Sequence, residues 1–235
     1  MIRKISHQQM GRSNRGWLRS LFHFSFAEYY NPDNMNFGVL RVLNDDLVAS
    51  KSGFDTHPHR DMEILSYVVK GELTHGDSMG NKSTITRGQV QYMSAGTGVA
   101  HSEHNLGEEE LRFLQIWILP DQKRHTPAYG DVKLDWDLRS GKWLHFASPV
   151  GGGASVELHQ DANFYAVELT GGQHIDFEVK TGRQVYLVLI EGSALVNGLR
   201  LETRDALESV EESLSIHVDQ PDQTAHLLVI EMAKG

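Results

Sequence analysis

The sequence predicts an all-β protein built from two small barrels, and three observations lead to this prediction. Short apolar segments recur along the 235 residues and are separated by turn-forming residues at regular intervals. Hydrophobic residues make up 40% of the chain, which suits one large β domain or two smaller ones of about 100 to 130 residues. The pattern weakens once, between residues 121 and 140, where Pro127, Gly130 and many charges gather. We therefore expect an N-terminal domain at 1–135 and a C-terminal domain at 136–235.

The strands predicted for the first half form a meander. Residues 2–10 are mixed in character and suit a first strand, whereas residues 22–26 alternate apolar and polar side chains as a half-buried strand does. A turn is expected at 31–34, and a short strand at 39–43 is expected to end at the turn-forming residues 44–46 (Asn-Asp-Asp). Further strands are expected at 64–69, 73–75, 91–93 and 111–119.

Short strands resume in the second half. They are expected at 143–147, 155–160, 164–169, 185–190, 193–197 and 225–230. The three glycines at 151–153 predict a flexible turn rather than a nucleotide-binding loop, because no helical pattern follows them.

Two pairs of polar residues at strand spacing are the candidate functional residues: His57 with His59, and His101 with Glu103. Side chains alternate between the two faces of a strand, so both members of each pair project to one side. Three imidazoles with one carboxylate resemble non-haem metal sites with open positions. One such pair alone is usually polar surface, but two pairs, each near a glycine suited to a sharp turn, favour a metal site held by two strands.

The other histidines lack partners at strand spacing and are expected to be surface or ordinary hydrogen-bonded residues. They are His7, His23, His75, His104, His125, His145, His159, His174, His217 and His226.

At the candidate residues the chain resembles the cupin superfamily, small jelly-roll barrels (double-stranded β-helices) whose two sequence motifs supply metal ligands. The residues similar to these motifs are Gly53, His57, His59, Glu63 and Gly71 for the first, and Gly88, Gly98, His101 and Asn105 for the second. Gly53 lies closer to His57 than the usual pattern allows, and Gly96 stands where a proline is common.

Within the cupins, the chain is most similar to the pirin family. The similar segments are His-Pro-His-Arg at 57–60 followed by Glu63, Ser-Ala-Gly-Thr-Gly-Val-Ala-His-Ser-Glu at 94–103, Leu-Gln-Ile-Trp at 114–117, Trp17-Leu18 and residues 22–26. The resemblance is strong over residues 1 to about 120 and covers the remainder only in general pattern.

The resemblance bears on which carboxylate is a ligand. Many cupins use the glutamate of the first motif, which is Glu63 here, whereas pirins are similar in using the one that matches Glu103. Spacing does not separate the two, because Glu63 is four residues from His59 and is also expected to face inward. From the pirin resemblance we expect Glu103 to be the ligand and Glu63 to be a polar group that either orients a ligand or faces the core.

The second half of the chain resembles a degenerate repeat of the first half. Aligning Gly192 with Gly71 sets residues 185–190 against 64–69. The positions equivalent to His57, His59 and Glu63 are then Glu178, Lys180 and Gln184. The expected fold is therefore a bicupin, which has two cupin barrels. A protonated lysine cannot ligate a metal, so we expect only the N-terminal barrel to bind one.

The resemblance also implies an activity. Four protein ligands around a six-coordinate metal leave two positions for water, dioxygen or a chelating substrate. Pirins resemble quercetin 2,3-dioxygenases in ligand set, so we expect a flavonol hydroxyl to lose its proton and dioxygen to open the heterocycle with release of carbon monoxide. Glu103 would be both ligand and general base. Met93 and Trp117 are candidate walls for a flat substrate, although we expect both more readily in the core.

Two other functions stay open. Pirins are also regarded as partner-binding regulators in which the redox state of the metal alters a surface, and the acidic charge here would permit a basic protein partner. A cupin isomerase or hydrolase, in which the metal polarises a carbonyl, is the third alternative. In each case we expect one divalent transition metal per chain. Iron is expected from the resemblance, with nickel, manganese, copper, cobalt and zinc as alternatives.

Charge and composition narrow the partners. The chain has 31 acidic and 22 basic residues and a net charge of −9, which argues against direct nucleic-acid binding. It has no cysteine, which excludes disulfides and thiolate metal sites. The first residues form no apolar signal segment, and no apolar run has the length that a bilayer requires. We expect a cytoplasmic protein with no membrane association, and we favour a monomer.

Overall fold

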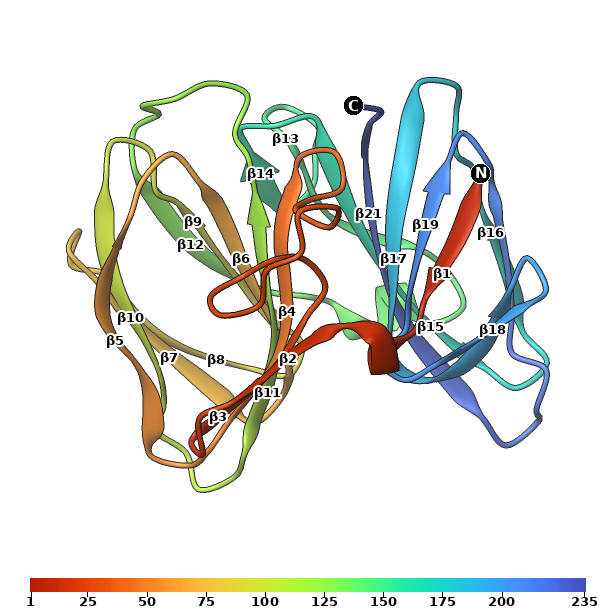
Figure 1. Cartoon of the computed structure of the whole chain (residues 1–235), viewed down its shortest axis with the longest axis horizontal. Helices are drawn as coiled ribbons and strands as arrows, with labels where there is room; N and C mark the ends of the chain where they lie inside the picture. The colour runs from red at the N-terminus through yellow and green to blue at the C-terminus, as the bar shows by residue number, and fades with distance from the viewer. The chain divides into compact units, whose positions relative to one another are not determined.

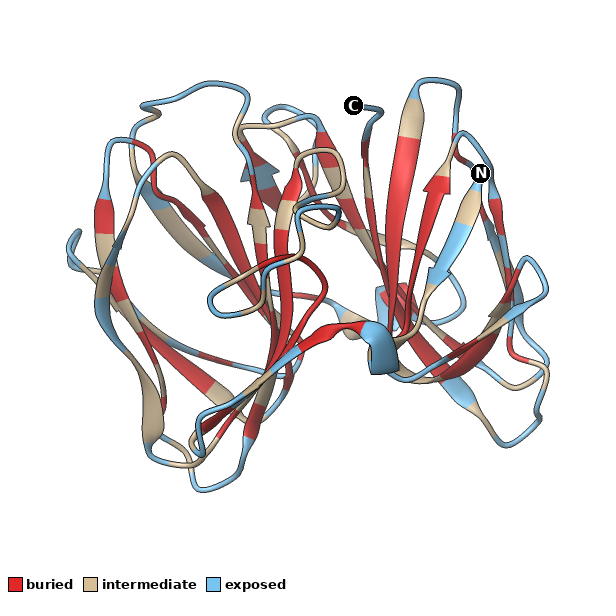
Figure 2. Cartoon of the chain, viewed as in Figure 1, coloured by how far each residue is buried: buried red, intermediate tan, exposed pale blue.

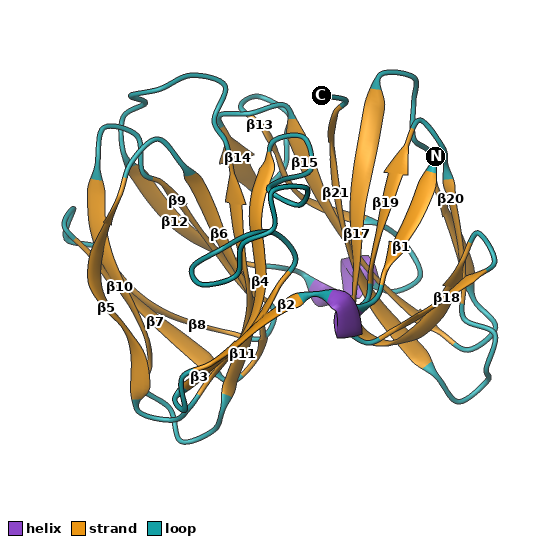
Figure 3. Ribbon diagram, viewed as in Figure 1, coloured by secondary structure: helices purple, strands orange, loops and turns teal.

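Strands are the main regular element of the structure, which is a computed structural model that describes residues 1–235 (Figure 1). Figure 3 shows the strands in orange and only two short 3-10 helices, at His7–Gln9 and Trp136–Arg139. Neither helix has the length and apolar character that a membrane crossing requires. The all-β prediction is confirmed.

The chain divides into two compact units. The N-terminal unit comprises Gly11–Leu134 and Leu158–Gln160, and the C-terminal unit comprises Met1–Met10, Asp135–Glu157 and Asp161–Gly235. The predicted domains, 1–135 and 136–235, differ from these units chiefly in two short segments. The first ten residues join the C-terminal unit because β1 (Ile2–Ile5) pairs with β19 (Ala206–Val210). Residues 158–160 join the N-terminal unit, where the His159 backbone N–H donates to the Glu63 carboxylate at 3.1 Å.

Two antiparallel sheets form the N-terminal unit. The larger has the order β12-β9-β6-β11-β4-β3-β2, and the smaller has the order β5-β10-β7-β8. The strands of the larger sheet are β2 (Gly11–Asn14), β3 (Leu18–Phe22), β4 (Leu40–Val48), β6 (Glu63–Lys70), β9 (Gln89–Ser94), β11 (Leu111–Ile118) and β12 (Ala128–Lys133). Those of the smaller are β5 (Ser52–His59), β7 (Glu72–Asp77), β8 (Lys82–Thr86) and β10 (Val99–Asn105).

Apolar side chains from both sheets meet in the core of this unit. Val68 and Phe113 of the larger sheet pack with Leu73 and Ile85 of the smaller, and all four are buried. Figure 2 shows buried residues in red along the strands. Inward residues alternate with outward ones along each strand. Some of the inward residues are apolar and form this core, and others are polar.

Asn44, Asp45 and Asp46 lie in the middle of β4, so the turn predicted at 44–46 is wrong. Three consecutive polar residues are typical of loops, but β4 is hydrogen-bonded on both edges, to β11 and β3. Tertiary pairing therefore decides the conformation here against local propensity.

The C-terminal unit contains a ten-stranded sheet with the main order β1-β19-β17-β21-β15-β13-β14, and β16, β18 and β20 extend it off this path. The strands not yet given are β13 (Leu144–Pro149), β14 (Val156–Leu158), β15 (Ala162–Thr170), β16 (His174–Phe177), β17 (Arg183–Val196), β18 (Leu199–Glu202), β20 (Leu214–His217) and β21 (Thr224–Ala233). Its core is aliphatic and buried. Glu178 and Lys180 are exposed, while Gln184 is buried and donates to the Ala233 carbonyl at 3.3 Å.

Candidate metal centre

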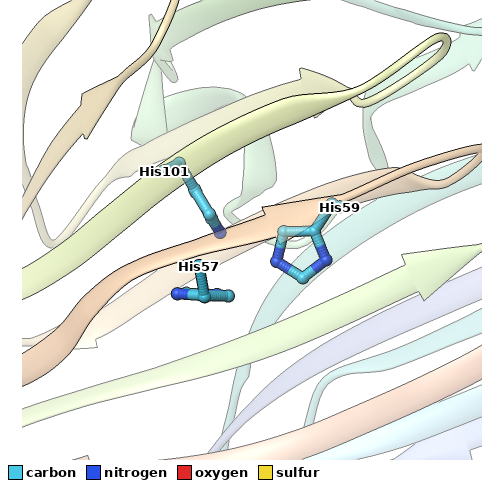
Figure 4. Close-up of side chains that lie close together, drawn as sticks. All are labelled: His57, His59 and His101. Carbon is cyan, nitrogen blue, oxygen red and sulfur yellow. The ribbon is translucent and has the colours of Figure 1, made fainter.

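Three histidines converge on the inner face of the smaller sheet. His57 and His59 come from β5 and His101 from β10, where His101 is the direct cross-strand neighbour of His57. The three ring centroids are 4.7 to 4.8 Å apart, and one nitrogen from each ring lies within 4.8 Å of the others (Figure 4). The spacing of two residues in β5 and the register of β10 therefore bring together three of the four predicted ligands.

Pro58 separates the two histidines of β5 without disturbing the sheet. It is exposed on the opposite face from the ligands, and β5 is the edge strand of its sheet. An edge strand tolerates a residue with no backbone N–H, because one side of the strand needs no ladder partner.

Burial favours the neutral form of two of the imidazoles, those of His59 and His101. It lowers the pKa of His59 to about 4 and that of His101 to about 3, and the neighbouring histidines lower both further. A neutral imidazole has a lone pair for a metal, whereas a protonated one has none. Histidines with these pKa values are available as ligands throughout the neutral range.

The ring nitrogens are arranged as a metal site requires. His57 Nδ1 donates to the Asp55 carbonyl at 2.7 Å, which leaves the Nε2 lone pair of His57 available. His101 Nε2 is buried and has no hydrogen-bond partner. Buried polar atoms are rarely left without a partner, so this nitrogen marks a ligand position. The donor set therefore fits a divalent transition metal.

A buried histidine and aspartate lie behind His101. His75 Nδ1 is 3.5 Å from His101 Nδ1, and His75 Nε2 is 3.0 Å from an oxygen of Asp77. The His75 ring also stacks on Tyr129, with ring centroids 4.2 Å apart. His75 is a hydrogen-bonded histidine as predicted, but its contact with the candidate ligand His101 was not predicted. The signal was available in the spacing of two residues between His75 and Asp77.

Glu103 is buried beside the histidines but lies outside their cluster. Its carboxylate accepts hydrogen bonds from Ser66 at 2.8 Å and from the side-chain amides of Gln91 and Gln115 at 2.5 Å each. These three donors are neighbours in one row across β9, β6 and β11. These donors hold the Glu103 carboxylate in one position.

Glu63 does not face the histidines, so the expectation that it points inward is wrong. It accepts hydrogen bonds from Tyr92 at 2.5 Å and Ser94 at 2.6 Å, on the opposite side of β6 from Ser66. The turn between β5 and β6 includes Asp61 at φ 50°, and this left-handed residue breaks the alternation on which the expectation depended.

A cavity of about 420 Å³ opens in front of the histidines. Its walls include His57, His59, Glu103, Trp117 and Phe26. Trp117 meets His59 edge to face at 4.9 Å and is a wall of the cavity, and it also packs, partly buried, against the core cluster that contains Met93. Met93 packs with buried Ile64 and Val99, which agrees with the core position expected for it.

Sequence comparison places both halves of the chain in known families. The family model described as Pirin matches residues 4–118, and the one described as Quercetinase C-terminal cupin domain matches residues 145–232. A quercetin 2,3-dioxygenase of Escherichia coli (strain K12) is 41% identical over 225 residues, which cover 95% of this chain and 96% of that protein. The chain belongs to the pirin family.

Structural comparison agrees. A crystal structure of a bacterial pirin from Escherichia coli, in complex with nickel(II), superposes with a TM-score of 0.93 at 37% identity and covers 100% of both chains. A pirin-like protein of Caulobacter vibrioides is 41% identical over 215 residues, 91% of this pirin and 93% of that protein. The bicupin fold expected from the sequence is confirmed.

Proposed function

We propose that this pirin is a metal-dependent dioxygenase that opens the heterocycle of flavonols such as quercetin. The observation that carries the proposal is a cluster of three imidazoles beside a buried carboxylate, where His57, His59 and Glu103 line an aromatic-walled cavity. The Escherichia coli relative named quercetin 2,3-dioxygenase supports the substrate class.

His57, His59, His101 and Glu103 would hold one metal ion. Such an ion would supply a Lewis acid for an ionised substrate oxygen and, for each metal considered except zinc, a redox partner for dioxygen. We propose iron, with nickel, manganese, copper, cobalt and zinc as the alternatives, because imidazole and carboxylate ligands suit all of them. The nickel(II) complex of the Escherichia coli pirin shows that a site of this family accepts a divalent ion.

The cavity suits a flat aromatic substrate. Its volume of about 420 Å³ lies within the usual range for small-molecule sites. Trp117 and Phe26 form one wall, with ring centroids 5.4 Å apart, and Trp17 and Phe54 form another, with centroids 5.2 Å apart. Aromatic walls of this kind favour stacking and edge contacts with planar rings.

Glu103 would accept the proton of the flavonol hydroxyl. Its carboxylate lines the cavity, and the Ser66, Gln91 and Gln115 donors fix its position. A positioned base of this kind typically contributes ~10²- to 10⁴-fold to a rate. The ionised flavonol then reacts with dioxygen. One molecule of dioxygen is consumed, the heterocycle opens to a phenolic ester of a benzoic acid, and carbon monoxide leaves.

Oxygen uptake and carbon monoxide release with quercetin test the proposal. We expect one equivalent of each per quercetin consumed by metal-loaded protein, and none by His57→Ala. Luteolin is a matched control, because it differs from quercetin only in lacking the hydroxyl whose proton Glu103 would accept, and we expect no uptake with it. Absence of uptake with every flavonol tried would overturn the proposal and favour the partner-binding alternative.

A further inference from the structure

Two polar side chains of β4 face the cavity beside the candidate metal centre. Asn44 is the cross-strand neighbour of Gln115, which holds Glu103, and Asp46 lies one row further along β4, opposite Phe113. Both side chains line the cavity, and each residue is only 3% exposed. They belong neither to the histidine cluster nor to the row of donors around Glu103.

Each of these residues has an unused acceptor. Asn44 Oδ1 and Asp46 Oδ1 are buried and have no hydrogen-bond partner in the protein, although Asp46 also bonds the Ser20 hydroxyl. The residue between them behaves differently. Asp45 points to the opposite face of β4, and Arg112 donates to both of its oxygens at 3.0 and 2.7 Å. Most buried polar atoms in proteins are paired, so two unpaired acceptors on one wall of a cavity point to a ligand.

The surroundings define the chemistry of that ligand. Phe26 and Phe54 line the same part of the cavity, and a smaller cavity of about 90 Å³ shares Phe26, Phe54, Asn44 and Asp46 as walls. A ligand there must offer hydrogen-bond donors on an apolar, planar frame. Burial raises the pKa of Asp46 to about 7, and the nearby Asp45 and Glu103 raise it further, so added negative charge is disfavoured. A phenolic hydroxyl meets these conditions because it is neutral and donates one hydrogen bond.

We propose that Asn44 and Asp46 form a subsite that accepts hydrogen bonds from the phenolic hydroxyl groups of an aromatic ligand in this cavity. The subsite rests on the proposed function for the placement of a flavonol against Glu103. The subsite would also discriminate between ligands. A ring system that has no hydroxyl group at this wall leaves both acceptors unpaired and binds more weakly.

Three flavonols that differ only in the hydroxyl groups of the pendant ring test the proposal: galangin with none, kaempferol with one and quercetin with two. Binding is measured by tryptophan fluorescence quenching on metal-free and metal-loaded protein, without turnover. We expect quercetin to bind roughly 10-fold more tightly than galangin, which corresponds to one or two net hydrogen bonds. In Asn44→Leu and Asp46→Leu we expect the ratio of the two Kd values to fall toward one, with the Kd for galangin little changed.

Asp33→Asn is the control, since it removes an exposed carboxylate that lines neither cavity. We expect this variant to keep the preference for quercetin. If Asp46→Leu fails to fold by circular dichroism, Asn44→Leu carries the test alone, because its acceptor is separate. Equal loss of quercetin and galangin binding in the variants, or no preference in the parent protein, would overturn the subsite.

The two proposals fail separately. If the binding preference holds but no flavonol consumes oxygen, the subsite stands and the dioxygenase proposal falls. If quercetin and galangin turn over with equal kcat/KM and bind equally, the dioxygenase proposal stands and the subsite falls.

Discussion

His75 lies directly behind His101, with the two Nδ1 atoms 3.5 Å apart and the other nitrogen of His75 3.0 Å from Asp77. Asp77 is itself fixed by the backbone N–H groups of Met79 and Asn81. The His101 ring is therefore positioned from the side away from the cavity, as outer groups commonly position metal ligands.

From this arrangement we predict that His75→Phe lowers metal affinity by ~10- to 100-fold, the usual effect of losing a group that orients a ligand. Phenylalanine keeps the ring that stacks on Tyr129 but cannot contact Asp77 or His101 through nitrogen. Competition with a chelating dye measures the affinity. The control is His104→Phe, since His104 neighbours Glu103 in sequence but lies outside the histidine cluster. Equal affinity of the two variants would show that His75 is only a packing residue.

Glu103→Gln should separate metal binding from chemistry. Glutamine keeps an oxygen of similar reach but cannot accept the flavonol proton at neutral pH. We expect metal to be retained more weakly and turnover of quercetin to fall by ~10²- to 10⁴-fold. Metal content and oxygen uptake are measured on the same preparations.

Glu63→Gln is the comparison for that variant. Because Glu63 is bonded to Tyr92, Ser94 and His159, away from the histidines, we expect a lower melting temperature and nearly unchanged metal content and turnover. Loss of metal and activity in Glu63→Gln but not in Glu103→Gln would reverse the two assignments.

Asp46→Asn should stabilise the protein increasingly as pH rises. The pKa of Asp46 is raised to about 7 in the folded state, chiefly by burial, from 3.8 when solvated. A raised carboxyl pKa contributes stability below pH 3.8, and that contribution is lost as pH rises through 7. The ionisable groups around Asp46 are Asp45 and Glu103, which raise its pKa, and those that line the same cavities: Arg15, Glu28, Asp55, His57 and His59.

The effect of this one group on the free energy of unfolding is at most about 4 kcal/mol between pH 4 and pH 8. We expect the melting temperature of Asp46→Asn to match that of the parent near pH 4 and to exceed it by as much as roughly 10 °C at pH 8. Asp33→Asn, at an exposed position, should show no such trend. A gap that stays constant with pH would mean that Asp46 is ionised in the folded protein at every pH tested.

Chelation should remove about one metal ion per chain and leave the protein folded. The core formed by Val68, Leu73, Ile85 and Phe113 is buried without any contribution from the metal ligands. We therefore expect an unchanged circular dichroism spectrum and a modestly lower melting temperature, as loss of a ligand bound only to the folded state requires. Unfolding on chelation would mean that the metal is structural.

The histidine cluster could be predicted from the sequence because it depends on alternation within single strands. His57 and His59 share one strand, and the bulge between His101 and Glu103 in β10 leaves His101 opposite His57. The same rule failed for Glu63, because a turn with a left-handed residue lies between it and His59. Alternation holds inside a strand but not across a turn.

The polar wall of the cavity could not be predicted from the sequence. Asn44 and Asp46 have the local character of a turn, and only the pairing of β4 with β3 and β11 makes them inward residues of a strand. The pairing of β1 could not be predicted either. Ile2 pairs with Ser209, and a local sequence pattern does not identify a partner strand so distant in the chain. In both cases the deciding contacts are long-range.

During synthesis, β1 leaves the ribosome long before β19 is made, since Ile2 and Ser209 are register partners. The strands between Gly11 and Leu134 can pair in the meantime, so the N-terminal unit has its sheets available first. An unpaired strand is a template for wrong pairing with other chains. β1 has only four residues, and its two central ones are the exposed Arg3 and Lys4, which later pair with Glu208 and Asp205. Their charge would repel other nascent copies of the same strand until those acidic partners emerge.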